Sequence, residues 1–126
     1  MGDEYHGYKD LIVYKKAFIL STSIFKITKA FPREEMFSLT DQMRRSSRSV
    51  GSNIAESWGK RRYVKSFIAK LVDSQAEACE TRHWLDQSLV YKYINAEQYK
   101  ELTGLLQEIQ KMLNAMIQNP NKFCHL

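Results

Sequence analysis

Apolar residues recur every three or four positions through most of this 126-residue chain, the spacing that is typical of amphipathic helices. The pattern predicts four helices, which cover residues 11–30, about 39–58, 63–89 and 96–118. Short connections separate them, and short connections favour antiparallel neighbours. The sequence therefore predicts an all-α fold, an antiparallel up-down-up-down four-helix bundle over residues 10–118, with flexible ends at residues 1–9 and 119–126.

Polar residues with capping chemistry stand near the predicted helix ends. Asp10 is expected to cap the first helix, and either Ser38 or Thr40 the second. Asn95 is expected to cap the fourth helix, with Gln98 three residues later as its capping-box partner. Such patterns place a helix end to within about two to four residues.

The first predicted helix has a wider apolar face than one packed stripe needs. One series of residues at helical spacing contains Leu11, Tyr14, Phe18, Ser21 and Phe25. A second series beside it contains Val13, Ala17, Leu20, Ile24 and Ile27. Surplus apolar surface must be covered by something. We therefore assign the second series to an interface between copies of the chain.

The two central helices differ in the size of their side chains. The second is rich in small residues, among them Ser46, Ser47 and Gly51, which indicates close packing against a neighbouring helix. In the third, the helical spacing places Gln75 and Arg82 on the same face as the apolar core residues. We therefore expect a tight contact along the second helix and a partly polar buried face on the third.

Composition narrows the class of protein. Hydrophobic residues make up 44% of the chain, which argues against disorder, and its apolar runs are too short for a transmembrane helix. Two cysteines cannot make a disulfide framework, and the N-terminal MGDEYHGYKD is too polar for a signal peptide. These features predict a cytoplasmic protein with no membrane association.

The net charge of +5 is unevenly distributed. Residues 39–72 hold eight basic and two acidic residues, a net +6, while the remainder carries 11 basic and 12 acidic residues, a net −1. A basic cluster of this kind attracts phosphate groups. The candidate contacts to nucleic acid, RNA or DNA, are Arg44, Arg48, Lys60, Arg61, Arg62 and Lys65.

One other interpretation of these basic residues stays open, as do two roles for the aromatic residues beside them. The basic residues would form a solvated face if acids elsewhere in the chain pair with them. Tyr63 and Phe67, beside the cluster, would either stack on bases or belong to the core.

Five polar residues lie close to the stripes that should be buried: Arg45, Asn53, Glu56, Glu77 and Glu80. Buried charges need partners, and Arg45, Arg48 and Arg82 are the available cations. We interpret the five as an inter-helix network of hydrogen bonds and ion pairs that fixes the register of the bundle.

Catalytic and metal-binding motifs are sparse. Glu80 and His83 form one E-x-x-H, which di-iron bundles use to place two ligands on one face. Those sites need two such motifs, and this chain has no second one. No nucleophile elbow, P-loop or dinucleotide fingerprint occurs. The sequence therefore predicts a protein that is not an enzyme and has no cofactor and no metal.

Three segments carry a resemblance: LTDQMRRSSRSVGSNIAESWGKRR (39–62), YKDLIVYKKAF (8–18) and SQAEACET (74–81). Together they resemble the bacterial four helix bundle protein family, also called the 23S rRNA-intervening-sequence proteins, over residues 8–118. The segment from Arg45 to Glu56 is the most specific part. Trp58 departs from the glycine that is usual after that glutamate, which moves the helix stop to Gly59.

The resemblance implies a four-helix bundle that assembles as a ring-like homopentamer. Related accessory proteins of diversity-generating retroelements have a similar fold and bind nucleic acid and a reverse transcriptase through basic surfaces. The family's name describes where some of its genes lie and does not by itself imply binding to ribosomal RNA. The resemblance therefore adds an oligomeric state and leaves the activity open.

Two main functional hypotheses follow from the sequence, and a third, enzymatic one rests on Glu80 and His83 alone. The first is a non-enzymatic homo-oligomer whose basic surface binds RNA or DNA without sequence specificity. The second is an assembly or adaptor protein that docks a protein partner, with the charge serving solubility or partner choice.

Overall fold

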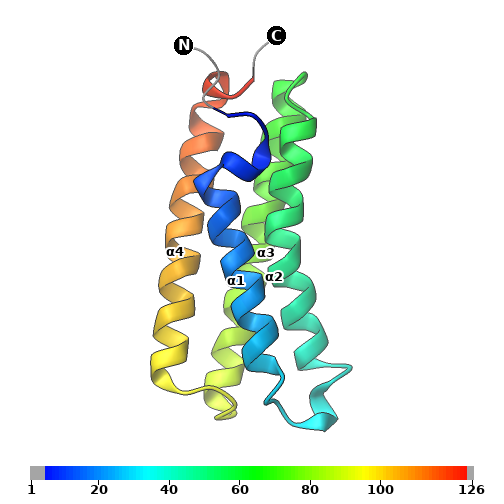
Figure 1. Cartoon of the computed structure of the whole chain (residues 1–126), viewed down its shortest axis with the longest axis vertical. Helices are drawn as coiled ribbons and strands as arrows, with labels where there is room; N and C mark the ends of the chain where they lie inside the picture. The colour runs from blue at the N-terminus through cyan, green and yellow to red at the C-terminus, as the bar shows by residue number, and fades with distance from the viewer. Residues whose placement is uncertain (1–4, 125–126) are drawn as a thin grey trace.

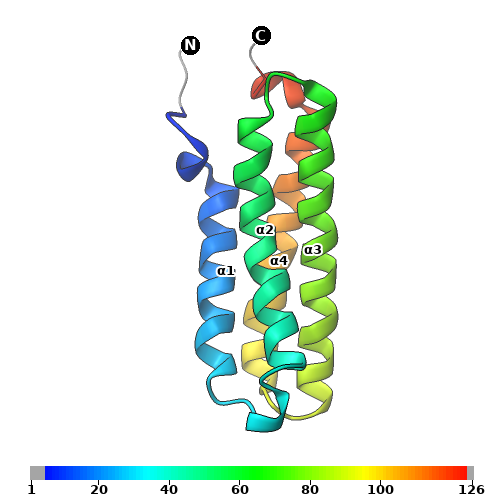
Figure 2. The same cartoon turned by 90° about the vertical axis from the view of Figure 1, so that its right-hand side faces the viewer.

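The computed structural model describes residues 5–124 and consists mainly of four long helices: α1 (Ile12–Thr28), α2 (Leu39–Gly59), α3 (Val64–Val90) and α4 (Ala96–Gln118). Three short 3-10 turns complete it: η1 (Tyr8–Asp10), η2 (Arg33–Glu35) and η3 (Pro120–Lys122). Each helix runs antiparallel to the next, and α4 returns to lie beside α1 (Figures 1 and 2). The predicted four-helix bundle is confirmed. Within residues 5–124, no helix is long and apolar enough to cross a membrane.

The two ends of the bundle carry different segments. η1, η3 and the α2–α3 turn lie at one end, whereas the α1–α2 and α3–α4 connections lie at the other (Figure 1). α2 and α3 make the most extensive contact in the bundle, and α1 packs in the groove between α2 and α4. Residues near the two ends of α2 are therefore far apart in space.

The starts of α1 and α2 differ from the prediction. Asp10 is the last residue of η1, and its carboxylate accepts a hydrogen bond of 2.7 Å from the backbone N–H of His6, so it does not cap α1. Ser38 precedes α2, but its hydroxyl donates to Glu35 Oε1 at 2.6 Å. That same oxygen accepts from the N–H of Leu39 at 3.4 Å, so Glu35 takes the place of a serine cap.

The start of α4 confirms the predicted capping box. The backbone N–H of Gln98 donates to Asn95 Oδ1 at 2.7 Å, and the N–H of Asn95 donates to Gln98 Oε1 at 2.9 Å. Two otherwise unpaired backbone donors are satisfied together, which fixes where α4 begins.

The structure corrects which face of α1 is open. Val13, Ala17, Leu20 and Ile24 are buried in the chain's own core, and Ile27 packs against that core. These residues point into the groove between α2 and α4, so they are not available to a second copy. The exposed apolar side chains of α1 are instead Ile12, Phe18 and Ile19, which are 61%, 61% and 55% exposed.

Hydroxyl side chains line the contact between α2 and α3. Ser74 Oγ donates to the carbonyl of Val50 at 2.7 Å, and the hydroxyls of Thr81 and Ser46 share a hydrogen bond of 2.9 Å. Ser88 Oγ lies 3.3 Å from a methionine sulfur on α2. This row of residues spaced seven apart, all fully buried, occupies the face expected to hold Gln75 and Arg82. Small hydroxyls allow α2 and α3 to approach closely.

Both segments expected to be flexible pack on the bundle where the structure describes them. Phe123 and Cys124 are buried after η3. The ring of Tyr5 lies 6.0 Å from that of Trp58 and 5.9 Å from that of Phe123. Phe123 in turn stacks on Phe67 at 6.2 Å. These aromatic contacts close one end of the core. Residues 1–4 and 125–126 lie outside the described residues.

Candidate nucleic-acid interface

The six residues predicted to contact phosphate fall into two groups. Lys60, Arg61, Arg62 and Lys65 surround the α2–α3 turn and, with Tyr63, form what we call the turn surface. Arg44 and Arg48 lie near the other end of α2. Seventeen residues separate Arg44 from Arg61, which corresponds to roughly 25 Å along a helix that rises ~1.5 Å per residue. The sequence cluster is therefore two surfaces.

The turn surface presents cations around one open aromatic ring. α2 ends where the N–H of Lys60 donates to the carbonyl of Ser57 at 3.0 Å, and α3 begins after Tyr63 in an extended conformation. Lys60, Arg62 and Lys65 are exposed, and Tyr63 is 65% exposed. An open ring among cations suits stacking on a nucleic-acid base.

Arg61 and Phe67 behave differently from the other candidates near the turn. The Arg61 guanidinium lies 3.7 Å from the centre of the Trp58 ring, and its Nε donates to the carbonyl of Trp58 at 2.8 Å. Phe67 is completely buried, so it belongs to the core and cannot stack on bases. Arg61 thus supports the turn from one side.

A second group of cations gathers where α1 ends beside α2. Lys29 Nζ lies 4.7 Å from the centre of the Phe25 ring, and the guanidinium carbons of Arg44 and Arg48 lie 4.8 Å and 5.9 Å from it. Arg44 Nε also donates to Thr28 Oγ1 at 2.9 Å. We call Phe25, Lys29, Arg44 and Arg48 the corner cluster.

The basic candidates lack the ion pairs that a charge-balanced face would show. Within residues 5–124 the ion pairs are Lys16–Glu108, Lys70–Glu56, Lys70–Asp73 and Arg82–Asp86. None of the six candidate phosphate contacts takes part in them. Their charge is therefore available to an external anion.

Lys70, which sequence reasoning missed, is the centre of the polar contacts near the α2–α3 turn. Its Nζ lies 3.1 Å from Glu56 Oε1, 3.8 Å from an Asp73 oxygen and 3.5 Å from Asn53 Oδ1. The hydrogen bond to Glu56 is the main cause that raises the pKa of Lys70. Asn53 is buried, and its amide also donates to the carbonyl of Ser49 at 2.9 Å.

The remaining members of the predicted network lie nearer the surface. Arg45 and Glu80 are exposed, and Glu80 accepts a hydrogen bond of 3.0 Å from Trp84 Nε1. Glu77 is half-buried. Its burial raises the pKa of its carboxyl, the charge of Glu80 raises it further, and the charge of Arg45 lowers it. The five residues therefore do not form one buried network.

The E-x-x-H pair faces outward from α3. Glu80 is held by Trp84, and the ring of His83 lies against the Trp84 ring at 4.7 Å. Across residues 5–124, no three His, Cys, Asp or Glu side chains gather closely enough to hold a metal ion. The pair thus sits on the surface with aromatic and hydrogen-bonding partners of its own.

Phe25 and Lys29 were also absent from the sequence-based site. They stand four residues apart, Phe25 in α1 and Lys29 directly after it, and both lie beside Arg44 and Arg48. Their i, i+4 spacing was visible in the sequence, but their neighbours on α2 were not. The cations of the corner cluster therefore come from two helices.

Within residues 5–124, the chain is an all-α bundle with two basic surfaces whose candidate phosphate contacts form no ion pair. The profile of the 23S rRNA-intervening sequence protein family matches residues 9–115, so the chain belongs to that family. A similar solved structure is that of a protein with unknown function from the S23 ribosomal protein family of Bacteroides thetaiotaomicron VPI-5482. It is 30% identical, covers 85% of this chain and 96% of its own, and gives a TM-score of 0.76. Among curated proteins, none is significantly similar to this chain.

Proposed function

We propose that this protein is a non-enzymatic, cytoplasmic homo-oligomer whose basic surface binds RNA or DNA through phosphate contacts, without sequence specificity. The observation that carries the proposal is the turn surface, where Lys60, Arg62 and Lys65 are exposed and form no ion pair within residues 5–124. Exposed, unpaired cations beside an open tyrosine ring supply both components of sequence-tolerant binding, charge and stacking.

The test of this proposal is the salt dependence of binding. The triple variant Lys60→Glu, Lys65→Glu and Arg62→Glu removes three candidate phosphate contacts. Each phosphate contact with a duplex contributes about 0.9 to the slope of log affinity against log salt. We expect the variant to lower the slope by roughly 2–3 and to weaken binding at low salt. Fluorescence anisotropy with a labelled duplex, measured over a series of salt concentrations, gives both quantities.

A matched control separates the turn surface from net charge. Lys15, Lys100 and Lys111 are exposed on α1 and α4, and their replacement by glutamate changes the net charge by the same amount. We expect this control to keep most of the salt slope. An equal loss of salt slope in the two triple variants would contradict the proposal. Binding whose affinity does not change with salt concentration would contradict it as well.

Exposed apolar side chains on α1 support assembly. Ile12 and Ile19 lie two turns apart on one face of α1, Phe18 lies about 100° around the helix from Ile19, and all three are more than half exposed. Large exposed apolar side chains of this kind are typical of interaction sites. We propose that neighbouring copies of the chain cover these side chains in a ring, for which the family resemblance favours five copies.

The molar mass in solution tests the assembly. Light scattering should show a mass several times 14.8 kDa, and replacing Phe18 and Ile19 by glutamate should reduce it toward one chain. Val72→Glu, on an exposed position of α3, serves as the control for adding charge to an apolar surface residue. A wild-type monomer would refute the assembly.

The opposite end of the bundle favours a second function, the docking of a protein partner. Phe37 is 90% exposed, and Met36, Val90 and Tyr91 are also exposed there. The hydrogen bond of 2.9 Å from the Tyr93 hydroxyl to Glu35 ties the two connections of this end together. Under this proposal, wild type retains a protein partner after nuclease treatment. Phe37→Ser and Tyr91→Ser lose that partner, whereas the turn-surface triple variant still binds it.

A further inference from the structure

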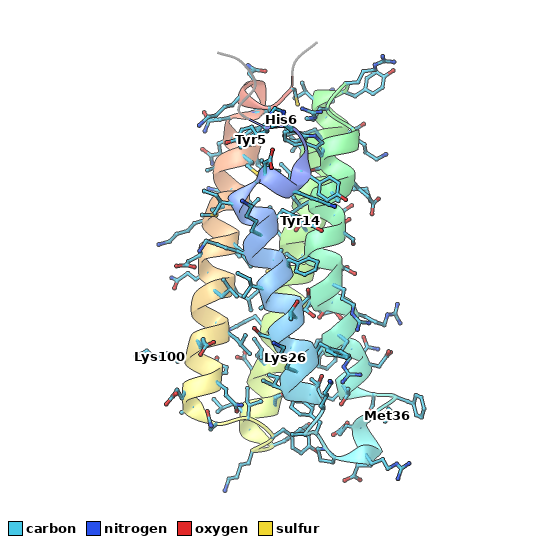
Figure 3. All side chains as sticks on the ribbon, viewed as in Figure 1. Tyr5, His6, Tyr14, Lys26, Met36 and Lys100 are labelled. Atoms are coloured by element: carbon cyan, nitrogen blue, oxygen red, sulfur yellow. The ribbon has the colours of Figure 1, made fainter. Side chains whose placement is uncertain are left out.

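A small pocket adjoins the corner cluster, where the end of α1 meets η2 and the start of α2. Its volume is about 230 Å³, below the ~300–1,000 Å³ of whole small-molecule sites. Figure 3 places Met36, one of its lining residues, at this end of the bundle. The size suits one chemical group of a ligand.

The lining of the pocket is strongly cationic. Lys29, Arg33 and Arg44 all border it. None of them forms an ion pair with a carboxylate in residues 5–124. The nearby carboxylate of Glu35 is already occupied by hydrogen bonds from Ser38, Leu39 and a tyrosine. Three positively charged side chains therefore border one pocket, and none of them forms an ion pair within residues 5–124.

Arg44 is held in a defined orientation at the pocket. Its Nε donates to Thr28 Oγ1 at 2.9 Å, and the Thr28 hydroxyl itself donates to the carbonyl of Ile24 at 2.7 Å. The terminal nitrogens of the guanidinium have no protein partner within the described residues. A guanidinium fixed through Nε presents these nitrogens as a fork, which suits the oxygens of phosphate or carboxylate.

Thr40 supplies an independent observation. Its hydroxyl is the one buried side-chain polar atom in residues 5–124 without a hydrogen-bond partner, and Thr40 lines the pocket. It is also the second residue of α2, in the turn whose backbone N–H groups have no partner inside the helix. Buried hydroxyls are normally paired, so an unpaired one in a pocket lined by three cations supports a ligand-binding role for this pocket.

We propose that this pocket binds a dianionic phosphate group, the phosphomonoester end of a ligand. Three cations, one oriented guanidinium fork and a hydroxyl offer more positive charge and more donors than a single carboxylate uses. The start of α2, where Glu35 accepts from only the N–H of Leu39, adds the positive end of the helix dipole. This site stands apart from the turn surface and does not depend on it.

Part of the positive charge has another role in the fold. Lys29 follows the last turn of α1, where cations offset the negative end of the helix. That role does not need the Arg44 fork or the Thr40 hydroxyl. Variants of these two residues therefore distinguish a phosphate site from a helix-end charge.

Calorimetric titration with inorganic phosphate, at constant ionic strength set with chloride, tests the site. We expect saturable binding that Arg44→Gln weakens about tenfold to a hundredfold, the range for losing hydrogen bonds to a charged group. Arg33→Gln changes an exposed side chain that forms no ion pair within residues 5–124, and it should weaken binding as well. Thr40→Val should weaken binding without lowering the Tm of the unliganded protein. Lys111→Gln, at an exposed position of α4 outside both basic surfaces, is the charge-matched control and should bind phosphate as wild type does.

An oligonucleotide pair identifies the source of the phosphate. Tighter binding of a 5′-phosphorylated strand than of the same strand with a 5′-hydroxyl, lost in Arg44→Gln, assigns the pocket to nucleic-acid ends. Equal binding of the two strands, together with saturable inorganic phosphate, assigns it to a free phosphate ester. No phosphate binding, or binding that Arg44→Gln and Arg33→Gln leave unchanged, overturns the inference. Failure of the turn-surface variants to change the salt slope bears only on the proposed function.

Discussion

The hydroxyl contact between Thr81 on α3 and Ser46 on α2 is the sharpest place to test how the bundle is held together. Both side chains are fully buried, and their oxygens lie 2.9 Å apart. Thr81 Oγ1 also lies 2.9 Å from the carbonyl of Glu77. Because Thr81 has one hydroxyl hydrogen, we infer that it donates to Glu77 and accepts from Ser46. Thr81→Val keeps the shape of the side chain and removes only this chain of hydrogen bonds.

The expected cost of Thr81→Val follows from what Ser46 loses. The remaining contact of Ser46 Oγ is a 3.4 Å approach to the carbonyl of Met43, so a buried hydroxyl is left almost without a partner. Leaving such a group unsatisfied costs about 1–3 kcal/mol of unfolding free energy. Combining Ser46→Ala with Thr81→Val removes the unpaired Ser46 hydroxyl. We therefore expect the double variant to be less destabilised than the sum of the singles by about 0.5–1.5 kcal/mol.

Thermal and urea denaturation of the four proteins at one concentration measure this coupling. Thr103→Val is the matched control, because the Thr103 hydroxyl donates to the carbonyl of Tyr99 at 2.8 Å in the same local geometry but has no partner on another helix. We expect the control to cost less than ~0.5 kcal/mol, as surface substitutions usually do. If Thr81→Val lowers the unfolding free energy no more than the control does, this contact does not join α2 to α3. Strictly additive losses in the double variant would refute the argument as well.

Three further predictions concern single sites. Gly51→Ala should raise the Tm, because the added Cβ meets its nearest neighbour, on Ala17, at an ordinary 3.7 Å while the helix gains up to ~1 kcal/mol in propensity; a lower Tm would contradict this packing. Hydrogen bonds from a serine and a tyrosine hold the pKa of the Glu35 carboxyl below its usual 4.5, so its stabilisation is present above that value and is lost as the pH falls through the lower folded-state pKa. The Tm difference between wild type and Glu35→Gln should therefore be largest near neutral pH and should shrink as the pH falls. A Tm difference that does not change with pH would contradict a stabilising role for these hydrogen bonds. Burial raises the pKa of the Cys124 thiol, whereas Cys79 is exposed. A thiol reagent followed by mass spectrometry should label Cys79 first in the folded protein, and equal rates would show that the packed tail opens freely.

Local sequence was sufficient to predict the four helices and the capping of one helix end, the start of α4. The 3.6-residue period of apolar side chains reports how a helix meets a core, so the four helices were predicted within a few residues of their observed bounds. The Asn95–Gln98 capping box is likewise local, since both partners lie within one turn. The sequence predicted where α2 begins but missed its cap, which comes from the Glu35 side chain in η2, outside the helix.

Burial on α1 and α3 depended on the tertiary structure. Two adjacent apolar faces of α1 were equally good candidates for the core, and only its place between α2 and α4 buried Val13, Ala17, Leu20 and Ile24. On α3, hydropathy favoured Gln75 and Arg82 no more than the hydroxyl residues that are buried instead. A serine or threonine is buried when a partner on the next helix satisfies it, and hydropathy does not carry that information.

The basic residues show the same division between sequence and structure. The sequence by itself determined that residues 39–72 carry an excess of positive charge, because charge is a property of composition. The length of α2 decided that this charge forms two surfaces roughly 25 Å apart, since a helix rises ~1.5 Å per residue. The fold also brought Phe25 of α1, and Lys29 directly after α1, next to Arg44 and Arg48 of α2. Contacts between residues distant in sequence arise only when the helices pack, which is why the corner cluster and its pocket were invisible in the sequence.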